Sequence, residues 1–253
     1  MSLLPKLLLV SALVAGRIGS FAQSTTGEIQ DTTYTITSRE VKDFDKIHLQ
    51  GPFNLYISQG TSESLKMDAP NEILSRMVAE VDGHTLNIHN KHDNWSQGYN
   101  SWYSDKSWWH KHKRITVYVT VKNLERLHVS GSGNVYFTGG ITAESLRLRT
   151  AGSAKVDGKV DVKKLYGRMS GSGNIKLAGS AASSRIRISG SGNFSAREMV
   201  TIRSKVHVSG SGHAEVNASE EVHADVRGSA HVSYTGTAKV SSSKSGSGGV
   251  SKL

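Results

Sequence analysis

The chain has 253 residues, with 31 Lys and Arg against 21 Asp and Glu, and 36% of its residues are hydrophobic. This length suits one large domain or two small ones, and the 26 glycines are more than the roughly 7% that is usual. The sequence contains no cysteine, which excludes disulfides, cysteine nucleophiles, thiolate metal sites and a lipid-modified N-terminal cysteine.

The first 22 residues have the pattern of a secretory signal peptide. Lys6 precedes an apolar run from Leu7 to Ala15, and the small residues Ser20 and Ala22 stand at −3 and −1 of a predicted cleavage site. The run is shorter than the roughly 20 residues of a membrane-spanning helix. We therefore expect export through the Sec pathway to the periplasm, the outer surface or the extracellular space, and cleavage after Ala22.

A flexible segment is predicted at residues 23–39 and a single β-rich domain at 40–253. A short helix is expected within 70–78, with Asn71 as its cap, because the PNEILSRMV pattern follows a proline. Alternating and β-branched residues predict strands at 46–57, 64–68 and 115–121, and a hairpin arm at 81–88.

An insert at residues 90–114 is unlike the rest of the domain. It holds all four tryptophans of the chain together with tyrosines and basic residues. Exposed aromatic rings beside cations can stack on sugar rings or nucleobases, whereas packed rings would cover unpaired strands at an end of the fold. Both interpretations stay open, and the candidate ligand-binding residues are Trp95, Tyr99, Trp102, Tyr103, Trp108, Trp109, Lys111, Lys113 and Arg114.

The second half of the chain is an internal repeat. A Gly-Ser-Gly or related element recurs seven times, at spacings of 21, 19, 19, 20, 18 and 18 residues, and a fainter copy begins at Gly51. Glycine at these places supplies the positive φ that a sharp corner needs. The predicted corner residues are Gly131, Gly152, Gly171, Gly190, Gly210, Gly228 and Gly246.

Apolar and polar residues alternate on both sides of these glycines, which predicts half-buried strands. Each unit reads as strand, tight corner, strand and looser corner, the last at Gly139-Gly140, Gly158 or Gly179. Such a unit buries its apolar face only by stacking on its neighbours, so the fixed period favours an all-β solenoid over a sandwich of hairpins. The expected core residues are Leu127, Val129, Val135, Leu148, Val156, Met169, Ile175, Ile188, Phe194, Val208, Val216, Val226 and Val232.

The ordered motifs resemble the "putative auto-transporter adhesin, head GIN domain" family of bacterial envelope proteins. The resemblance begins at Phe44–Ile47, continues through Gly51–Leu55 and Val81–Gly83, and closes with the Gly-Ser-Gly repeats as far as Gly248. It implies a right-handed parallel β-helix with Gly-Ser-Gly corners, exposed at the cell envelope, whose role is adhesion or scaffolding.

The charge is concentrated in the repeat half. Residues 127–253 carry 17 basic and 8 acidic side chains, a net charge of +9, whereas residues 23–126 carry 12 and 13, a net charge of −1. A field of this sign favours a glycan or another anionic envelope polymer as partner. The alternative is that the charge only keeps the protein soluble.

Motifs for catalysis, cofactors or metals are missing from the sequence. No phosphate-loop motif, nucleophile elbow or His-Glu-x-x-His motif occurs, and no acidic residue recurs at the position that calcium-binding repeats require. The carboxylates of the repeat half occupy different repeat positions, so we do not expect them to cluster. We therefore expect no catalytic residue, no cofactor, no bound metal and no specific nucleic-acid partner. The alternative is a carbohydrate-active enzyme resembling polysaccharide lyases.

Overall fold

The structure, a computed structural model, describes residues 34–91 and 115–253. These residues are almost entirely β structure, and the one helix among them, α1, has four residues and spans Asn71–Leu74. No helix in the described ranges has the length and apolarity needed to span a membrane. The strands are β1 (Tyr34–Arg39), β2 (Lys46–Gln50), β3 (Asn54–Gln59), β4 (Ser64–Pro70), β5 (Met77–Asp82), β6 (Thr85–Asn90), β7 (Thr116–Val121), β8 (Arg126–Gly131), β9 (Asn134–Gly152), β10 (Lys155–Gly171), β11 (Asn174–Gly190), β12 (Asn193–Gly210), β13 (His213–Gly228), β14 (His231–Thr235), β15 (Lys239–Ser245) and β16 (Gly249–Lys252).

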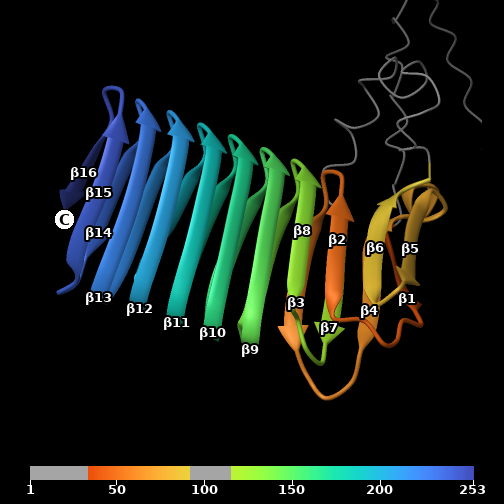
Figure 1. The fold of residues 1–253 in the computed structure, drawn as a ribbon. Helices are drawn as coiled ribbons and strands as arrows, with labels where there is room; N and C mark the ends of the chain where they lie inside the picture. Colours follow the sequence, from red (N-terminus) through yellow and green to blue (C-terminus); the bar gives the residue numbers. More distant parts are fainter. Residues whose placement is uncertain (1–33, 92–114) are drawn as a thin grey trace, which may run out of the picture. The chain divides into compact units, whose positions relative to one another are not determined.

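The repeat half is a parallel β-solenoid, as the period predicts. Each of the long strands β9 to β13 pairs in parallel with the next along nearly its whole length, so one strand contributes both arms of a coil (Figure 1). The tight corners are in register from coil to coil, because Gly152 pairs with Gly171 and Gly171 with Gly190. Equivalent positions of successive repeats therefore form straight columns across the sheet.

The corner glycines meet two requirements at once. Gly190 has a φ of +121°, and a Cβ at this residue would lie 2.5 Å from the carbonyl oxygen of Gly171 in the preceding coil. The same carbonyl accepts a hydrogen bond from the amide of Ser191 at 3.0 Å. All seven glycines at the predicted corners have positive φ, so a side chain there would be strained and would also press on the neighbouring backbone.

The looser corners do not interrupt the strands. β9 runs through Gly139 and Gly140, both at positive φ, and its pairing with β10 resumes at Ile141 and Val160 after a register shift. The longest unit thus accommodates its two extra residues as a bulge on the arm after the tight corner. The arm before the tight corner keeps its register, so the columns there stay aligned despite the unequal spacings.

The fainter repeat at Gly51 forms a coil of its own. β2 pairs in parallel with β8, β3 pairs in parallel with β9, and Gly51 donates a backbone hydrogen bond to Ser130 at 3.1 Å. The next layer is formed by β6 and β7, which pair with the other sides of β2 and β3 although they follow them in sequence. The antiparallel strands β1, β4 and β5 complete this N-terminal part.

Two details differ from the sequence-based expectations. β structure begins at Tyr34, inside the predicted flexible segment 23–39, because β1 pairs antiparallel with β4. The helix is one turn long, and Pro70 rather than Asn71 stands at its N-cap, with no side-chain hydrogen bond. Asn134, which follows the Gly131 corner, donates a hydrogen bond to the Asn54 side chain at 2.9 Å.

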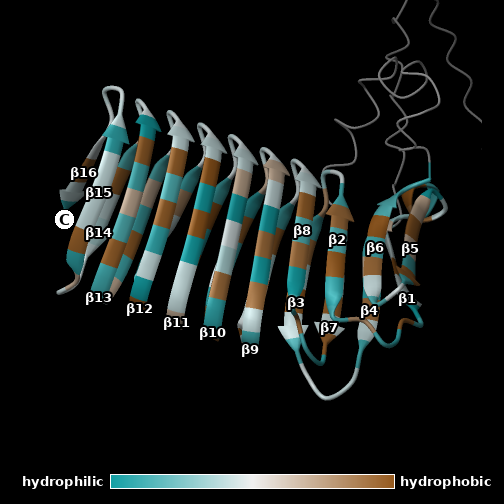
Figure 2. Cartoon of the chain, viewed as in Figure 1, coloured by the Kyte–Doolittle hydropathy of each residue, from teal (hydrophilic) through white to brown (hydrophobic). Residues whose placement is uncertain are grey.

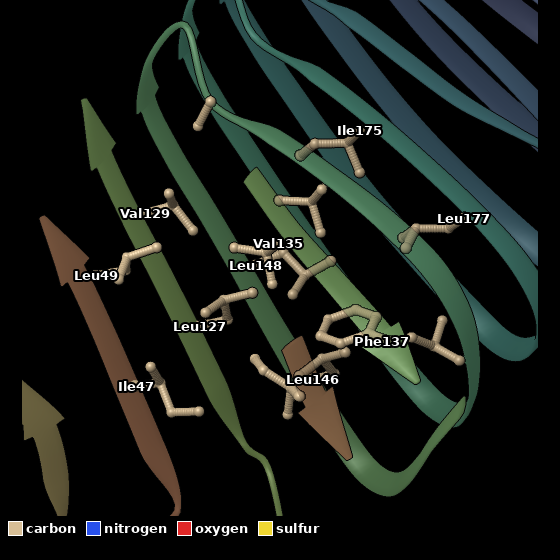
Figure 3. Packing of buried hydrophobic residues seen from close by; sticks show 14 of the residues in the cluster. Ile47, Leu49, Leu127, Val129, Val135, Phe137, Leu146, Leu148, Ile175 and Leu177 are labelled. Carbon is tan, nitrogen blue, oxygen red and sulfur yellow. The ribbon is translucent and has the colours of Figure 1, made fainter. Parts of the chain in front are cut away.

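The core lies between the two arms of each coil. Apolar and polar residues alternate along the strands in Figure 2, and every core residue expected from the repeat is buried. Figure 3 shows side chains from both arms, such as Leu127, Leu148 and Phe137, pointing into the same narrow space. The outward positions of each arm are therefore free for polar and charged residues.

Candidate binding surface

Two columns of outward side chains run across the arm that precedes the tight corners. On β2 and on β8 to β12, these side chains stand five and three residues before the corner glycine of the strand. The parallel pairing of these strands places equivalent side chains next to each other. The first column is Lys46, Arg126, Arg147, Tyr166, Arg185 and Lys205, and the second is His48, His128, Arg149, Arg168, Arg187 and His207. Together they hold six arginines and no acidic residue.

The arginines of the two columns lack acidic partners. Each of the six is exposed, and among the described residues no carboxylate forms an ion pair with any of them. Adjacent coils are about 4.8 Å apart, and like charges directly opposite one another destabilise a sheet. The surface thus concentrates positive charge that the fold does not neutralise.

From β9 to β12 the acidic side chains lie in other columns, and several of them form ion pairs with lysines. Lys163 contacts Glu144 at 2.7 Å, Lys159 contacts Asp161 at 3.5 Å, and Lys176 contacts Glu198 at 3.5 Å. Toward the C-terminus, the first acid in the second column is Asp225 of β13, which lies 3.9 Å from His207 and 3.6 Å from His223. The free positive charge is therefore confined to the coils that precede β13.

A shallow recess lies between the columns. Its volume is about 400 Å³, and its walls include the four arginines of β9 and β11. Tyr166 is half-buried there, and the Arg147 guanidinium carbon lies 5.4 Å from the centre of its ring. The recess thus combines several guanidinium groups with one aromatic ring, a combination suited to a ligand with anionic groups on a ring framework.

A stacked histidine pair stands in the second column beside the arginines. The His48 and His128 rings lie 4.5 Å apart, and their planes differ by 3°. Partial burial, with the nearby charges of His48, Arg149 and Arg126, lowers the pKa of His128 to about 4. Burial also lowers the pKa of His48. Both rings are neutral at physiological pH, where they can donate hydrogen bonds without adding charge.

A row of tyrosines lies on the other arm. Tyr118, Tyr56 and Tyr136 stack with ring centroids 5.4 and 5.0 Å apart, and the Lys155 ammonium lies 5.7 Å from the Tyr136 centroid. Because the rings cover one another's faces, they present edges and hydroxyl groups outward. They do not form a flat platform for stacking on sugar rings.

The binding residues predicted from the sequence lie outside the described residues. This applies to the whole aromatic and basic set from Trp95 to Arg114. No cluster of three or more potential metal ligands occurs in the part of the chain that the structure describes.

The basic columns were not predicted from the sequence, although the sequence contains a signal for them. Basic residues or histidines recur at fixed offsets before the corners, as in RLHVSGSG at 126–133, RLRTAGS at 147–153 and RIRISGSG at 185–192. Aligning the repeats on their glycines would have shown this pattern. The net charge of the half-chain alone did not place the charges on one face.

The family described as "Putative auto-transporter adhesin, head GIN domain" matches residues 43–238. The chain belongs to this family. Its match begins just before β2 and ends just before β15, so it includes every coil that contributes to the basic columns. A comparison with curated proteins found no match.

Solved structures of similar proteins have the same fold as this head GIN domain chain. A putative adhesin from Bacteroides fragilis is 25% identical, with a TM-score of 0.77 over 87% of this chain and 97% of that one. A putative adhesin from Parabacteroides distasonis is 20% identical, with a TM-score of 0.69 over 88% and 98%. A structure from the same organism described as a putative lipid binding protein is 23% identical, with a TM-score of 0.65 over 88% and 98%. The likeness to these last two shows the fold alone.

Proposed function

We propose that this chain is an exported adhesin or scaffold protein of the cell envelope, and that it binds a glycan or another anionic envelope component without chemical turnover. The observation that carries the proposal is the pair of basic columns, whose six arginines have no acidic partner among the described residues. The adhesin family supports an envelope role, and the N-terminal signal pattern supports export.

The arrangement of the carboxylates supports binding rather than catalysis. Glycoside hydrolysis needs two carboxylates facing one bond, and the acids of the solenoid half described above are held separately in ion pairs with lysines. The two basic columns between β2 and β12 contain no acid that could serve as proton donor. The side chains of the two columns can therefore bind an anion but supply no carboxylate for hydrolysis.

The proposal is tested with purified mature protein on immobilised glycans. We expect retention on acidic glycans, little retention on neutral ones, and a loss of binding at high salt because exposed charges are screened. Long incubation with the retained glycan should release neither new reducing ends nor unsaturated uronate products. Release of either product at a rate proportional to protein concentration would establish the enzyme alternative instead.

A further inference from the structure

The basic columns form a regular array of cationic groups. Along each column the step equals the strand spacing of about 4.8 Å, and the two columns lie two residues apart on each strand, which is about 7 Å. Arginine occupies one or both positions on each of the four strands β8 to β11. The array therefore repeats in one direction, perpendicular to the strands.

We propose that the two columns bind a linear acidic polysaccharide with a carboxylate or sulfate group on each sugar, and that this ligand lies across the strands with one sugar on each coil. This inference rests on the proposed function and specifies the ligand class and its direction. An extended pyranose chain advances by roughly one strand spacing per sugar, so its acidic groups would keep step with the columns. Each guanidinium can donate two parallel hydrogen bonds to a carboxylate or sulfate.

The array also defines how long the bound segment is. At one end Lys46 pairs with Asp45 at 2.9 Å, and at the other end Asp225 follows His207 in the second column. Between these limits the stretch from β8 to β12, which contains no acidic residue in either column, covers four steps, or about 20 Å. A segment of four or five sugars would occupy it.

The recess in the middle of the array suits a sugar ring. It lies between the columns where Tyr166 replaces an arginine, and Leu148 and Gly167 also line it. A ring seated there could contact the half-buried Tyr166 while its acidic groups reach Arg149, Arg168 and Arg187 in the second column. The neutral His128 ring at the edge of the recess offers a further hydrogen bond to a hydroxyl group.

Two other polyanionic partners fit the array less well. The phosphates of each strand of B-DNA rise by about 3.4 Å along the helix axis and follow a helical path, so they would leave a straight row after a few steps. A membrane surface would favour exposed apolar or aromatic side chains beside the charges. Among the described residues the exposed large hydrophobic side chains, such as Tyr118, Val200 and Ile202, all lie outside the two columns.

The test measures binding of the full mature chain to oligogalacturonates of defined length by calorimetry. The column variant combines Arg149→Gln, Arg168→Gln and Arg187→Gln, and the control variant combines Arg197→Gln, Lys244→Gln and Lys252→Gln. Both remove three positive charges, but the control residues lie outside the columns. Equal melting temperatures and circular dichroism spectra establish that both variants fold.

We expect the affinity of the wild type to rise with length up to four or five sugars and then to level off. The column variant should bind about 100-fold more weakly, because three charge-assisted contacts are lost. The control should stay within about threefold of the wild type, because its residues are outside the two columns and exposed charges are screened by salt. Methyl esterification of the oligomer should abolish binding, since it removes the charge and keeps the backbone.

The opposing outcomes separate this inference from the proposed function. Equal weakening of column and control variants would overturn the columns as a site, because only net charge would then matter. Tight binding of oligogalacturonate by the column variant would overturn the inference and leave the proposed function standing. Stronger binding to single-stranded DNA or to phosphatidylserine vesicles than to the oligomer would overturn the ligand class. A wild type that binds no acidic polymer or glycan would overturn both.

Discussion

His48 and His128 stack face to face at 4.5 Å although 80 positions separate them in the chain. Their contact exists because β2 and β8 pair in parallel with the two residues in register. The fainter first repeat thereby becomes a true coil of the solenoid, and a histidine pair joins the column that continues into Arg149, Arg168 and Arg187.

The histidine pair predicts a pH dependence of stability. The folded pKa of His128 is about 4, against about 6.5 in an unfolded chain, so between these values the unfolded state binds the additional proton. Stability should therefore fall as the pH drops from about 6.5 toward 4, by about 1–2 kcal/mol after allowance for the half-exposed ring. Chemical denaturation across this pH range, with NMR titration of the His128 ring, measures it.

The matched variant is His128→Gln, which removes the titration and keeps a polar side chain. Its stability should change less between pH 6.5 and 5 than that of the wild type. An unperturbed His128 titration near pH 6.5 would contradict the stacked arrangement. Bound polyanion should raise the His128 pKa, because a nearby negative charge favours the imidazolium.

The corner at Gly190 predicts a large steric penalty. Gly190→Val should cost about 2 kcal/mol or more, because a β-branched residue is strained at positive φ and the Cβ would press on the Gly171 carbonyl. Gly139→Ala is the control: Gly139 also has positive φ, but a Cβ there would meet nothing within 4 Å. In thermal melts, the melting temperature of Gly139→Ala should be well above that of Gly190→Val. Equal melting temperatures would refute the close approach of neighbouring corners.

Alternation on β11 predicts opposite outcomes for two adjacent residues. Ile188→Asp should unfold or strongly destabilise the protein, because it places an unpaired charge in the buried core. Arg187→Asp should leave the melting temperature within a few degrees of the wild type, because Arg187 is exposed. The same Arg187→Asp protein should bind acidic glycan far more weakly, which melting and binding measured on one sample would show.

The unneutralised arginines predict that simple salt stabilises the free protein. Raising NaCl from about 0.01 M to about 0.15 M shortens the Debye length from about 30 Å to about 8 Å, so repulsion between the stacked guanidinium groups should weaken and the melting temperature should rise. The triple column variant should respond less than the triple control variant. Equal salt responses of the two variants would show that the repulsion lies elsewhere.

The aromatic insert remains a separate prediction. If the Trp102 ring serves as a binding face, Trp102→Ala should weaken glycan binding without lowering the melting temperature. If the Trp108 ring, close in sequence to the 115–121 strand, is packed, Trp108→Ala should lower the melting temperature. Binding and melting curves for both variants distinguish the two roles. A fall in melting temperature with Trp102→Ala and unchanged binding would reject the insert as a binding site.

The repeat alone was enough to predict the coils, because each unit contains its own corner glycine and its own alternating arms. Ile188 and Val208 could be assigned to the core, and Gly190 to a corner, from short-range pattern without any knowledge of their partners. The fold class follows from such local rules because a unit that cannot bury its own apolar face has to stack on the next one.

Only the tertiary structure decided which coil lies beside which at the N-terminal part and how the outward residues align. β6 and β7 pair with β2 and β3 from the side opposite β8 and β9, an order that depends on long-range pairing and leaves no periodic trace in the sequence. The arginine columns require that unequal repeats keep their register on one arm, and the bulge at Gly139 and Gly140 places the extra residues on the other. Backbone hydrogen bonding between coils, rather than spacing along the chain, therefore brings the arginines together.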